Sequence, residues 1–356
     1  MRILFLCTDI YGGHGGIALF NREFAATLTS LPECEELVVL PRVIPRPGEH
    51  DVPAKVRFVA EAARGALAYV AALWRELRRR GRFDLVICGH VNLLPLARLA
   101  SKQPLLVTHG VEAWKPLRDP LSNALVHRCR GIISVSAVTR DRLRGWSGYQ
   151  GPMYVLPNAI RAERYGIRPK NPALVERYKV AGKRVLLTVG RMDAGERYKG
   201  FDEVMEVLPS LPEDVVYMIA GGGNDVLRLQ QKAVELGVGG RIAFTGIFAE
   251  EEKPDLYNLA DVYVMPSRGE GFGFVFLEAL ASGVPVIAST QDGGREALLN
   301  GELGVLVEPG DAAELRRAIE QLLAQPARAV PEGLAYFSFE NFERRVHEIM
   351  RAVMKI

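Results

Sequence analysis

The stretch RGEGFGFVFLEALASG, Arg268 to Gly283, places two glutamates around a Gly-Phe-Gly turn and the start of a helix. Glu270 precedes the turn, whereas Glu278 lies inside FVFLEALA, which is otherwise apolar. Glycines at the start of a helix allow a ligand to approach backbone N–H groups that the helix leaves unpaired. A carboxylate among apolar side chains is costly unless it is hydrogen-bonded. The stretch therefore predicts a loop and a helix that together hold a polar ligand.

Around this stretch, short β-branched runs alternate with helical patterns along the whole chain. The strand candidates are RILFLC, LVVL, DLVIC, LLVT and GIISV, and then RVLLTVG, VVYMIAGGG, IAFTG, DVYVMP, VPVIAS and GVLVEP. This rhythm is typical of βαβ units with a buried parallel sheet. It is interrupted by PNAIRAERYGIRPKNP, Pro157 to Pro172, whose prolines and polar residues indicate a linker. We therefore expect an α/β protein with two doubly wound, Rossmann-like domains that face each other across a cleft.

The expected domains are residues 1–160 and 161–338, followed by a C-terminal helix over 339–356 that crosses back to the first domain. A chain of 356 residues is longer than single hydrophobic cores usually accommodate, which agrees with two domains. No apolar run is long enough for a membrane span, and MRILFLC is better explained as a first strand than as a signal peptide. Four widely spaced cysteines favour a reduced, cytoplasmic protein.

The charge is unevenly divided. Residues 1–160 hold 21 Lys and Arg against 13 Asp and Glu, whereas the remainder holds 24 against 29, which together give the net +3. The densest cluster is RELRRRGR, at the end of a helix expected over Val59 to Leu77; its arginines are Arg75, Arg78, Arg79, Arg80 and Arg82. It is either a solvated helix C-terminus or a contact with a lipid-linked acceptor or with anionic lipid at the inner face of the membrane. Nucleic acid is disfavoured, because no aromatic interleaving or nucleic-acid motif accompanies the charge.

The two glutamates suit the hydroxyl groups of a nucleotide sugar. A carboxylate accepts two hydrogen bonds side by side, so Glu278 matches the adjacent hydroxyls of a ribose. Glu270 and the N–H groups of Gly271, Phe272 and Gly273 match the hydroxyls of a sugar ring. Alternatively, Glu278 is a structural carboxylate and Glu270 a first-turn glutamate stabilised by the helix dipole.

Two cations stand in GRMDAGERYKGF, which begins at the last residue of the strand candidate RVLLTVG. Arg191 follows Gly190 at the strand end, and Lys199 comes eight residues later. Two cations in one loop can bind a diphosphate and stabilise its charge as it departs. The alternative is a surface ion pair with Asp193 or Glu196.

Dinucleotide fingerprints are poorly supported. The dinucleotide-binding pattern GxGxxG is incomplete in AGGGN, Ala220 to Asn224, and also in TDIYGGHGG, Thr8 to Gly16. No Asp-x-Asp stands at a strand end, so no metal is needed to hold a diphosphate, and no cofactor is expected.

In combination, these motifs resemble the retaining GT-B glycosyltransferases, whose E-x7-E pair is matched by Glu270 and Glu278. The resemblance is strong from Thr188 to Asp311 and looser at GGHGG, VTHG and LPNAI. It implies an N-terminal acceptor-side domain and a C-terminal domain that binds the nucleotide sugar.

The resemblance also implies site residues. Catalytic roles fall to Arg191, Lys199, Glu270 and His109. Donor binding falls to Gly15, Gly16, Gly190, Gly222, Gly223, Thr245, Gly246, Ile247, Phe248, Gly271, Phe272, Gly273 and Glu278. The family often has His-Asp where this chain has His109-Gly110, which leaves the role of His109 open, and those of His14 and His90 stay open too.

The activity implied is transfer of a hexose from a nucleoside diphosphate sugar to a hydroxyl of a saccharide or lipid-linked acceptor. Mannose from GDP-mannose is the leading donor. The alternatives are a nucleotide-sugar epimerase, a sugar phosphorylase and a non-catalytic nucleotide-sugar-binding protein, since fold alone does not separate them.

Overall fold

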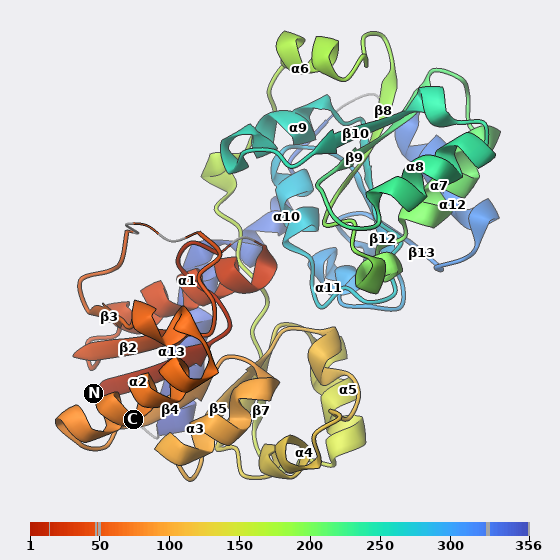
Figure 1. Ribbon diagram of the computed structural model, residues 1–356. Helices are drawn as coiled ribbons and strands as arrows, with labels where there is room; N and C mark the ends of the chain where they lie inside the picture. The colour runs from red at the N-terminus through yellow and green to blue at the C-terminus, as the bar shows by residue number, and fades with distance from the viewer. Residues whose placement is uncertain (14, 47, 49–50, 325–327, 355–356) are drawn as a thin grey trace. The chain divides into compact units, whose positions relative to one another are not determined.

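The computed structural model describes residues 1–13, 15–46, 48, 51–324 and 328–354, apart from the side chain of Arg80. The chain divides into two compact units. Unit 1 comprises Met1–Ala159 and Phe339–Ile356, and unit 2 comprises Ile160–Ser338. Each unit is built on a parallel β-sheet, so the predicted α/β class with two doubly wound sheets is confirmed (Figure 1).

Unit 1 contains a seven-stranded sheet in the order β3-β2-β1-β4-β5-β6-β7. Its strands are β1 Arg2–Cys7, β2 Glu36–Pro41, β3 Val56–Phe58, β4 Leu85–Cys88, β5 Leu105–Thr108, β6 Gly131–Ser134 and β7 Met153–Val155. Its helices are α1 Gly16–Ser30, α2 Ala66–Arg80, α3 Leu94–Ala100, α4 Pro120–Val126, α5 Ala137–Ser147 and α13 Phe339–Met354. The central strands are buried on both faces, which explains why their sequences are continuous apolar runs and do not alternate.

Helices α1 and α13 pack together in unit 1. The ring of Phe20 on α1 meets Phe342 on α13 edge to face, with centroids 5.9 Å apart. The hydroxyl of Ser30 donates a 2.7 Å hydrogen bond to Glu343. Helix α13 buries Phe342, Val346, Ile349, Met350 and Val353 along one face. The last helix of the described chain is therefore part of the core of the first sheet.

The helix expected over Val59 to Leu77 is wrong at its start. A short 3₁₀ helix covers Ala60–Arg64, and α2 begins only at Ala66. Gly65 between them has a φ of 137°, a conformation that interrupts a helix and that favours glycine. Helix α2 then continues to Arg80, three residues beyond the expected end.

Unit 2 contains a six-stranded sheet in the order β10-β9-β8-β11-β12-β13. Its strands are β8 Arg184–Val189, β9 Val215–Ala220, β10 Ile242–Gly246, β11 Val262–Val264, β12 Val286–Ser289 and β13 Val305–Val307. Its helices are α6 Pro172–Arg177, α7 Phe201–Val207, α8 Val226–Glu235, α9 Lys253–Leu259, α10 Phe274–Ala281, α11 Gly294–Ala297 and α12 Ala312–Leu323. Helices α7, α8 and α12 share one core with the sheet.

The strand order of unit 2 reverses between β8 and β11. From β8 the chain proceeds to β9 on one side, and it later returns to β11 on the other side of β8. In open parallel sheets, ligands bind beyond the carboxyl ends of the strands at such a switch point. The loops that follow β8 and β11 carry the predicted site residues. Among the helices that the structure describes, none combines the length and the apolar character needed to cross a bilayer.

Candidate active site

The segment after β8 brings Arg191 and Lys199 to one carboxylate. The guanidinium of Arg191 donates to Oε1 of Glu196, and Nζ of Lys199 lies 3.5 Å from Oε2 of the same side chain. The hydrogen bond to Glu196 raises the pKa of Arg191. The two predicted cations therefore converge, and the carboxylate between them is one of the two partners that the sequence suggested as an alternative.

This segment is held in place by its other side chains. Asp193 caps the 3₁₀ helix Ala194–Lys199 by accepting the N–H of Gly195, at 2.9 Å. Arg197 forms two hydrogen bonds with Asp225, at 3.2 and 2.8 Å. Tyr198 packs so closely on Gly269 that a Cβ there would lie 2.6 Å from its ring, which explains the glycine. The β8 segment is thereby fixed against the loop that follows β11.

Glu270 lies on that loop and faces Lys199. Its Oε2 is 3.8 Å from Nζ of Lys199, and the two side chains are 20% and 13% exposed. Burial lowers the pKa of Lys199, but the carboxylates of Glu270 and Glu196 outweigh it, and the pKa is raised overall. Lys199 is therefore a protonated cation between two carboxylates. The structure thus groups Arg191, Lys199 and Glu270, the first three predicted catalytic residues.

The backbone of Glu270 is clamped by the loop that follows β12. Its N–H donates to Oδ2 of Asp292 at 2.8 Å, and its carbonyl accepts the N–H of Gly293 at 2.9 Å. A Cβ on Gly293 would lie 2.0 Å from the carbonyl oxygen of Gly271, so only glycine fits there. Burial raises the pKa of Asp292 to about 7, against the opposing effect of donors from Ser267, Glu270 and Gly294. Sequence reasoning missed Asp292, because nothing in STQDGG distinguishes a clamp from an ordinary turn.

The glycine turn opens helix α10 as predicted. Gly273 has a φ of 90°, and no side chain caps the helix that begins at Phe274. Within the described part of the chain, the N–H groups of Gly271, Phe272 and Gly273 have no assigned acceptor. These three donors lie next to Glu270 in sequence and suit an acceptor group on a ligand.

Glu278 is satisfied without a ligand. Its Oε1 accepts a hydrogen bond from Nζ of Lys253 at 2.8 Å, and its Oε2 accepts one from the hydroxyl of Tyr257 at 2.7 Å. The Glu278 side chain is 2% exposed, and that of Lys253 is 14% exposed. These contacts agree with the alternative of a structural carboxylate, and the contact of Glu278 with a ribose stays a prediction. Sequence reasoning also missed both partners, which lie one helical turn apart on α9.

The glycines after β9 have a structural reason. A Cβ on Gly221 would lie 2.1 Å from the carbonyl oxygen of Gly190, and one on Gly223 would lie 1.9 Å from that of Met192. The chain after β8 therefore passes directly over these glycines. Gly222 instead faces Ile247, at 2.8 Å from its hypothetical Cβ, and Ile247 is 85% exposed. The predicted groups at 222–223 and 245–248 thus lie side by side, with Thr245, Gly246 and Phe248 next to Ile247 in the chain.

In unit 1 the predicted residues gather at the ends of β1, β4 and β5. Nε2 of His109 lies 3.1 Å from the carbonyl of Gly89, so this nitrogen is the donor and Nδ1 is left as the acceptor. Burial lowers the pKa of His109, despite the nearby Glu112, so the imidazole is neutral at pH 7. His90 accepts the N–H of Asn92 through Nδ1, at 3.2 Å. His109 therefore has a structural bond, and its second nitrogen is left as a hydrogen-bond acceptor.

The glycines after β1 lie at the start of α1. Gly15, with a φ of 92°, is the N-cap of the helix that begins at Gly16, and a Cβ on Gly15 would meet nothing within 4 Å. His14 lies outside the described residues. The open helix N-terminus fits the predicted approach of Gly15 and Gly16 to a phosphate.

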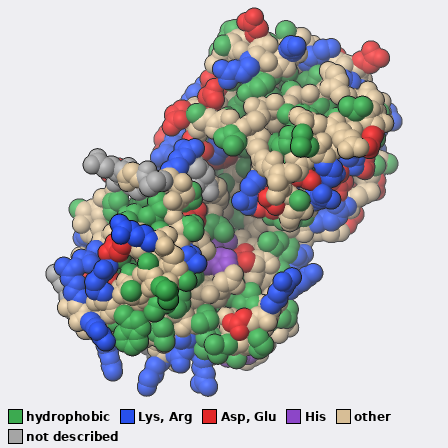
Figure 2. Space-filling model, in the orientation of Figure 1, with side chains coloured by type: hydrophobic (Ala, Val, Ile, Leu, Met, Phe, Trp, Pro, Cys, Tyr) green, Lys and Arg blue, Asp and Glu red, His purple; other side chains and the backbone are tan. Residues whose placement is uncertain are grey.

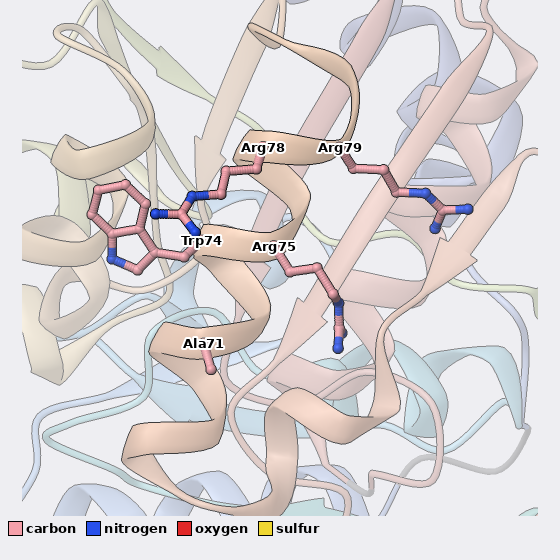
Figure 3. Close-up of a pocket in the computed structure, with 5 residues that line it drawn as sticks. All are labelled: Ala71, Trp74, Arg75, Arg78 and Arg79. Atoms are coloured by element: carbon pink, nitrogen blue, oxygen red, sulfur yellow. The ribbon is translucent and has the colours of Figure 1, made fainter.

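The basic cluster lies on the exposed face of α2. Figure 3 shows a shallow hollow on this helix, lined by Ala71, Trp74, Arg75, Arg78 and Arg79. Arg78 lies 5.7 Å from the centre of the Trp74 ring, which is 49% exposed. In Figure 2, Lys and Arg side chains project from the lower edge of unit 1, where α2 and α3 lie in Figure 1.

The five predicted arginines differ in their surroundings. Arg75 is paired with Glu61 and has Glu76 at 3.8 Å. Arg78, Arg79 and Arg82 are exposed, and the side chain of Arg80 is outside the described set. The cluster is therefore an exposed aromatic and cationic surface in which Arg75 is already neutralised.

Metal ligands do not gather in either unit as far as the chain is described. Within those residues, no group of three or more His, Cys, Asp or Glu side chains is placed to hold an ion. The four cysteines are free and buried. The charges of Arg191, Lys199, Glu196 and Glu270 meet at the switch point of unit 2.

Comparison with known proteins agrees with this architecture. The structure of HepE from Anabaena, in complex with UDP and glucose, matches 99% of this chain and 100% of that chain with a TM-score of 0.78 at 22% identity. Sucrose-phosphate synthase from Thermosynechococcus elongatus matches 100% of both chains with a TM-score of 0.80 at 21% identity. Two parallel α/β units of this kind define the GT-B fold, and the predicted fold is confirmed.

Sequence comparison defines the family. Residues 14–164 match the model described as "Glycosyltransferase Family 4", and residues 174–333 match "Glycosyl transferases group 1". The chain belongs to this family of retaining, metal-independent glycosyltransferases.

Curated relatives include two mycobacterial mannosyltransferases. A GDP-mannose-dependent alpha-(1-6)-phosphatidylinositol monomannoside mannosyltransferase of Mycolicibacterium smegmatis is 33% identical over 270 residues, which are 70% of this chain and 69% of that protein. A phosphatidyl-myo-inositol mannosyltransferase of Mycobacterium leprae is 36% identical over 269 residues, which are 72% of this chain and 69% of that protein. The prediction of a glycosyltransferase is confirmed.

Proposed function

We propose that this protein transfers a hexose from a nucleoside diphosphate sugar to a hydroxyl of a saccharide or lipid-linked acceptor, with GDP-mannose as the leading donor. The observation that carries the proposal is the convergence of Arg191, Lys199 and Glu270 beside the glycine turn that opens α10. Both relatives are mannosyltransferases by name, which favours mannose, and the name of the Mycolicibacterium smegmatis relative specifies GDP-mannose as its donor. Residues 161–338 would bind the donor and residues 1–160 the acceptor.

Each group of the site has a role in this proposal. Arg191 and Lys199 bind the diphosphate and stabilise its growing negative charge as the bond to the sugar lengthens. Glu270 and the N–H groups of residues 271–273 hold the hydroxyls of the sugar. Glu278 holds the ribose, with Lys253 and Tyr257 fixing its carboxylate. The surface formed by Gly222, Gly223 and residues 245–248 contacts the base.

Retention of configuration requires the acceptor to attack from the face that the diphosphate leaves. The sugar then carries oxocarbenium character, and an oxygen of the departing phosphate takes the proton of the acceptor hydroxyl. The C–O bond to the acceptor forms as the C–O bond to the phosphate breaks. His109, neutral at pH 7, is the candidate on the acceptor side for a hydrogen bond to the reacting sugar.

The first experiment is calorimetric titration with GDP, UDP and ADP, on the wild type and on Glu278→Ala. One nucleoside diphosphate should bind selectively, and loss of Glu278 should weaken it by about 1–3 kcal/mol. The selected sugar nucleotide is then supplied with saccharide and lipid-linked acceptors, and product anomers are assigned by NMR. Binding of no nucleoside diphosphate by the folded wild type would refute the proposed function.

We also propose that the exposed face of α2 contacts anionic lipid. The face combines Trp74, which suits a membrane interface, with the exposed Arg78 and Arg79, and the exposed Arg82 follows two residues after the end of the helix. Vesicles that contain anionic phosphatidylglycerol should sediment the protein, and purely zwitterionic vesicles should not.

A matched pair of variants tests the surface. Arg78→Gln with Arg79→Gln should reduce sedimentation, because two exposed cations are removed from α2. Arg316→Gln with Arg317→Gln removes the same charge from exposed positions of α12 in unit 2 and should leave sedimentation unchanged. Equal loss in both variants would mean that net charge, and no particular face, governs adsorption.

A further inference from the structure

Glu196 occupies the position at which the two phosphate-binding cations converge. One of its carboxylate oxygens accepts the guanidinium of Arg191, and the other lies 3.5 Å from Nζ of Lys199. A carboxylate and a phosphate group present oxygens to cations in similar ways. The side chain therefore stands where an oxygen pair of a bound diphosphate would stand.

The cluster is electrically balanced by this arrangement. Two cations, Arg191 and Lys199, face two carboxylates, Glu196 and Glu270, within salt-bridge distance. Glu196 and Lys199 are only 19% and 13% exposed, so water screens their interaction less than at an open surface. A diphosphate carries at least two negative charges and meets like charge at Glu196 as long as that carboxylate stays in place.

The backbone at Glu196 is fixed, whereas the contacts that the structure gives its side chain are those with Arg191 and Lys199. Asp193 and Arg197 anchor the segment on either side, through Gly195 and Asp225 respectively. Glu196 itself forms a kink in the 3₁₀ helix, with φ −119° and ψ 26°. Rotation of its side chain would therefore release both cations without displacing the segment.

We propose that Glu196 is an internal competitor for the diphosphate of the donor. In the empty enzyme it neutralises Arg191 and Lys199 and holds them at one point. The incoming nucleoside diphosphate displaces its side chain, and the return of Glu196 assists release of the nucleoside diphosphate product. This inference rests on the proposed function and concerns the strength of diphosphate binding at the same site.

The test is calorimetric titration of the full chain with GDP and UDP, each beside its own nucleoside. Glu196→Gln keeps the size of the side chain and removes its charge. It should bind the preferred nucleoside diphosphate about tenfold more tightly, because a like charge next to the phosphates is removed. It should bind guanosine or uridine as the wild type does, since these carry no phosphate. Inhibition of transfer by the nucleoside diphosphate product should strengthen in parallel.

Glu203→Gln is the matched control. Glu203 is paired with Arg268, and its side chain is 19% exposed, as is that of Glu196. Loss of its charge should leave diphosphate affinity within about twofold of the wild type, because it does not bridge Arg191 and Lys199. An equal gain in both variants would reduce the effect to general electrostatics and overturn the proposal.

The remaining outcomes are also decisive. If Glu196→Gln binds the nucleoside diphosphate with unchanged affinity, the contact is an ordinary ion pair. If it binds more weakly, Glu196 only orients the cations. Either result overturns the proposal. Glu196→Ala provides a second variant, and circular dichroism checks that both are folded. If the wild type binds none of GDP, UDP and ADP, the proposed function itself fails. If the wild type binds one of them and Glu196→Gln has the same affinity, only the inference about Glu196 fails.

Discussion

At the scale of the residue, the proposed donor site is made of charges that already have partners. The cations Arg191 and Lys199 face Glu196, and the buried carboxylate of Glu278 faces Lys253. A ligand that binds here must replace these ion pairs by contacts with itself. A substitution of one charged residue also leaves its partner without a counter-charge. The following predictions depend on that exchange.

Replacing Arg191 by alanine should lower turnover by roughly 100-fold or more, because the proposed mechanism then loses a cation that stabilises the departing diphosphate. Arg184→Ala is the control: Arg184 also pairs with a carboxylate, Asp214, at 2.6 and 2.7 Å, but at the opposite end of β8. Its turnover should be close to that of the wild type. Steady-state transfer rates of the two variants test this prediction. A near-normal rate for Arg191→Ala would mean that Arg191 has no catalytic role.

Replacing Lys253 by methionine should destabilise the protein. The change leaves the buried carboxylate of Glu278 without its cation, and breaking a buried pair on one side costs about 3 kcal/mol. Urea unfolding monitored by circular dichroism measures the loss. The double variant Lys253→Met with Glu278→Gln should recover most of it, because no unpaired charge is then buried. Absence of recovery would mean that the ion pair is not the source of the loss.

Asp292 should make stability depend on pH. Burial raises its pKa from 3.8 to about 7 in the folded protein, so between pH 4 and pH 7 the folded state binds more protons than the unfolded state. The contribution of this group to stability is therefore fully present below pH 4 and is lost as pH rises to 7. The slope should approach about −1.4 kcal/mol per pH unit near pH 5.5.

Urea unfolding between pH 5 and pH 7.5 measures this dependence, with Asp292→Asn as the comparison. The asparagine does not titrate, so subtracting its curve from that of the wild type isolates the contribution of Asp292. A difference that is flat with pH would mean that Asp292 is ionised throughout.

At the scale of the element, the loops after β11 and β12 form one unit through their glycines. Gly293→Ala would place a Cβ 2.0 Å from the carbonyl oxygen of Gly271 and force the Glu270 loop to move. We expect a loss of about 1–3 kcal/mol in unfolding free energy and a clear loss of transfer activity. Gly239→Ala, whose Cβ would meet nothing within 4 Å, should change neither. Full activity of Gly293→Ala would show that the loop tolerates displacement.

The sequence predicted the elements whose apolar runs are long and buried. Strands β3 and β7 were not predicted from the sequence, because each is a three-residue edge strand that is only partly buried. Gly65 broke the helix expected from Val59, although the apolar spacing continued across it. The position of Arg191, Lys199 and Glu270 in loops that follow strands was predictable, and parallel sheets bind ligands at such loops. Their catalytic roles stay predictions.

Their partners were harder to predict. Glu278 and Lys253 lie on different helices, and their contact depends on how α9 and α10 pack. Asp292 holds Glu270 through backbone atoms that carry no side-chain signature. Contacts of this kind depend on tertiary geometry and therefore lie beyond what local sequence patterns express.

At the scale of the whole molecule, the two units can be observed separately. The three tryptophans, Trp74, Trp114 and Trp146, all belong to unit 1. Deleting residues 339–356 removes α13 and exposes the face of α1 against which Phe342 packs. Loss of several buried apolar side chains, at about 1.5–3 kcal/mol each, should leave unit 1 unfolded or nearly so.

Tryptophan fluorescence should then report an unfolded environment in the truncated chain, while circular dichroism retains the cooperative transition of unit 2. The variant Phe342→Ala is a milder version and should lower the urea midpoint of the fluorescence transition alone. A truncated chain with native fluorescence would contradict the assignment of α13 to the core of unit 1.

The placement of α13 has a consequence for synthesis on the ribosome. Unit 2 is formed by one continuous segment, Ile160–Ser338, whereas unit 1 is formed by segments on both sides of it. Unit 2 emerges from the ribosome after most of unit 1, but its whole segment is available first. It is therefore the first unit that can finish folding. The first unit must wait, with the α1 surface uncovered, until α13 has left the exit tunnel. During that interval the nascent chain presents an apolar surface to chaperones, and a pause in translation before residue 339 would prolong its exposure.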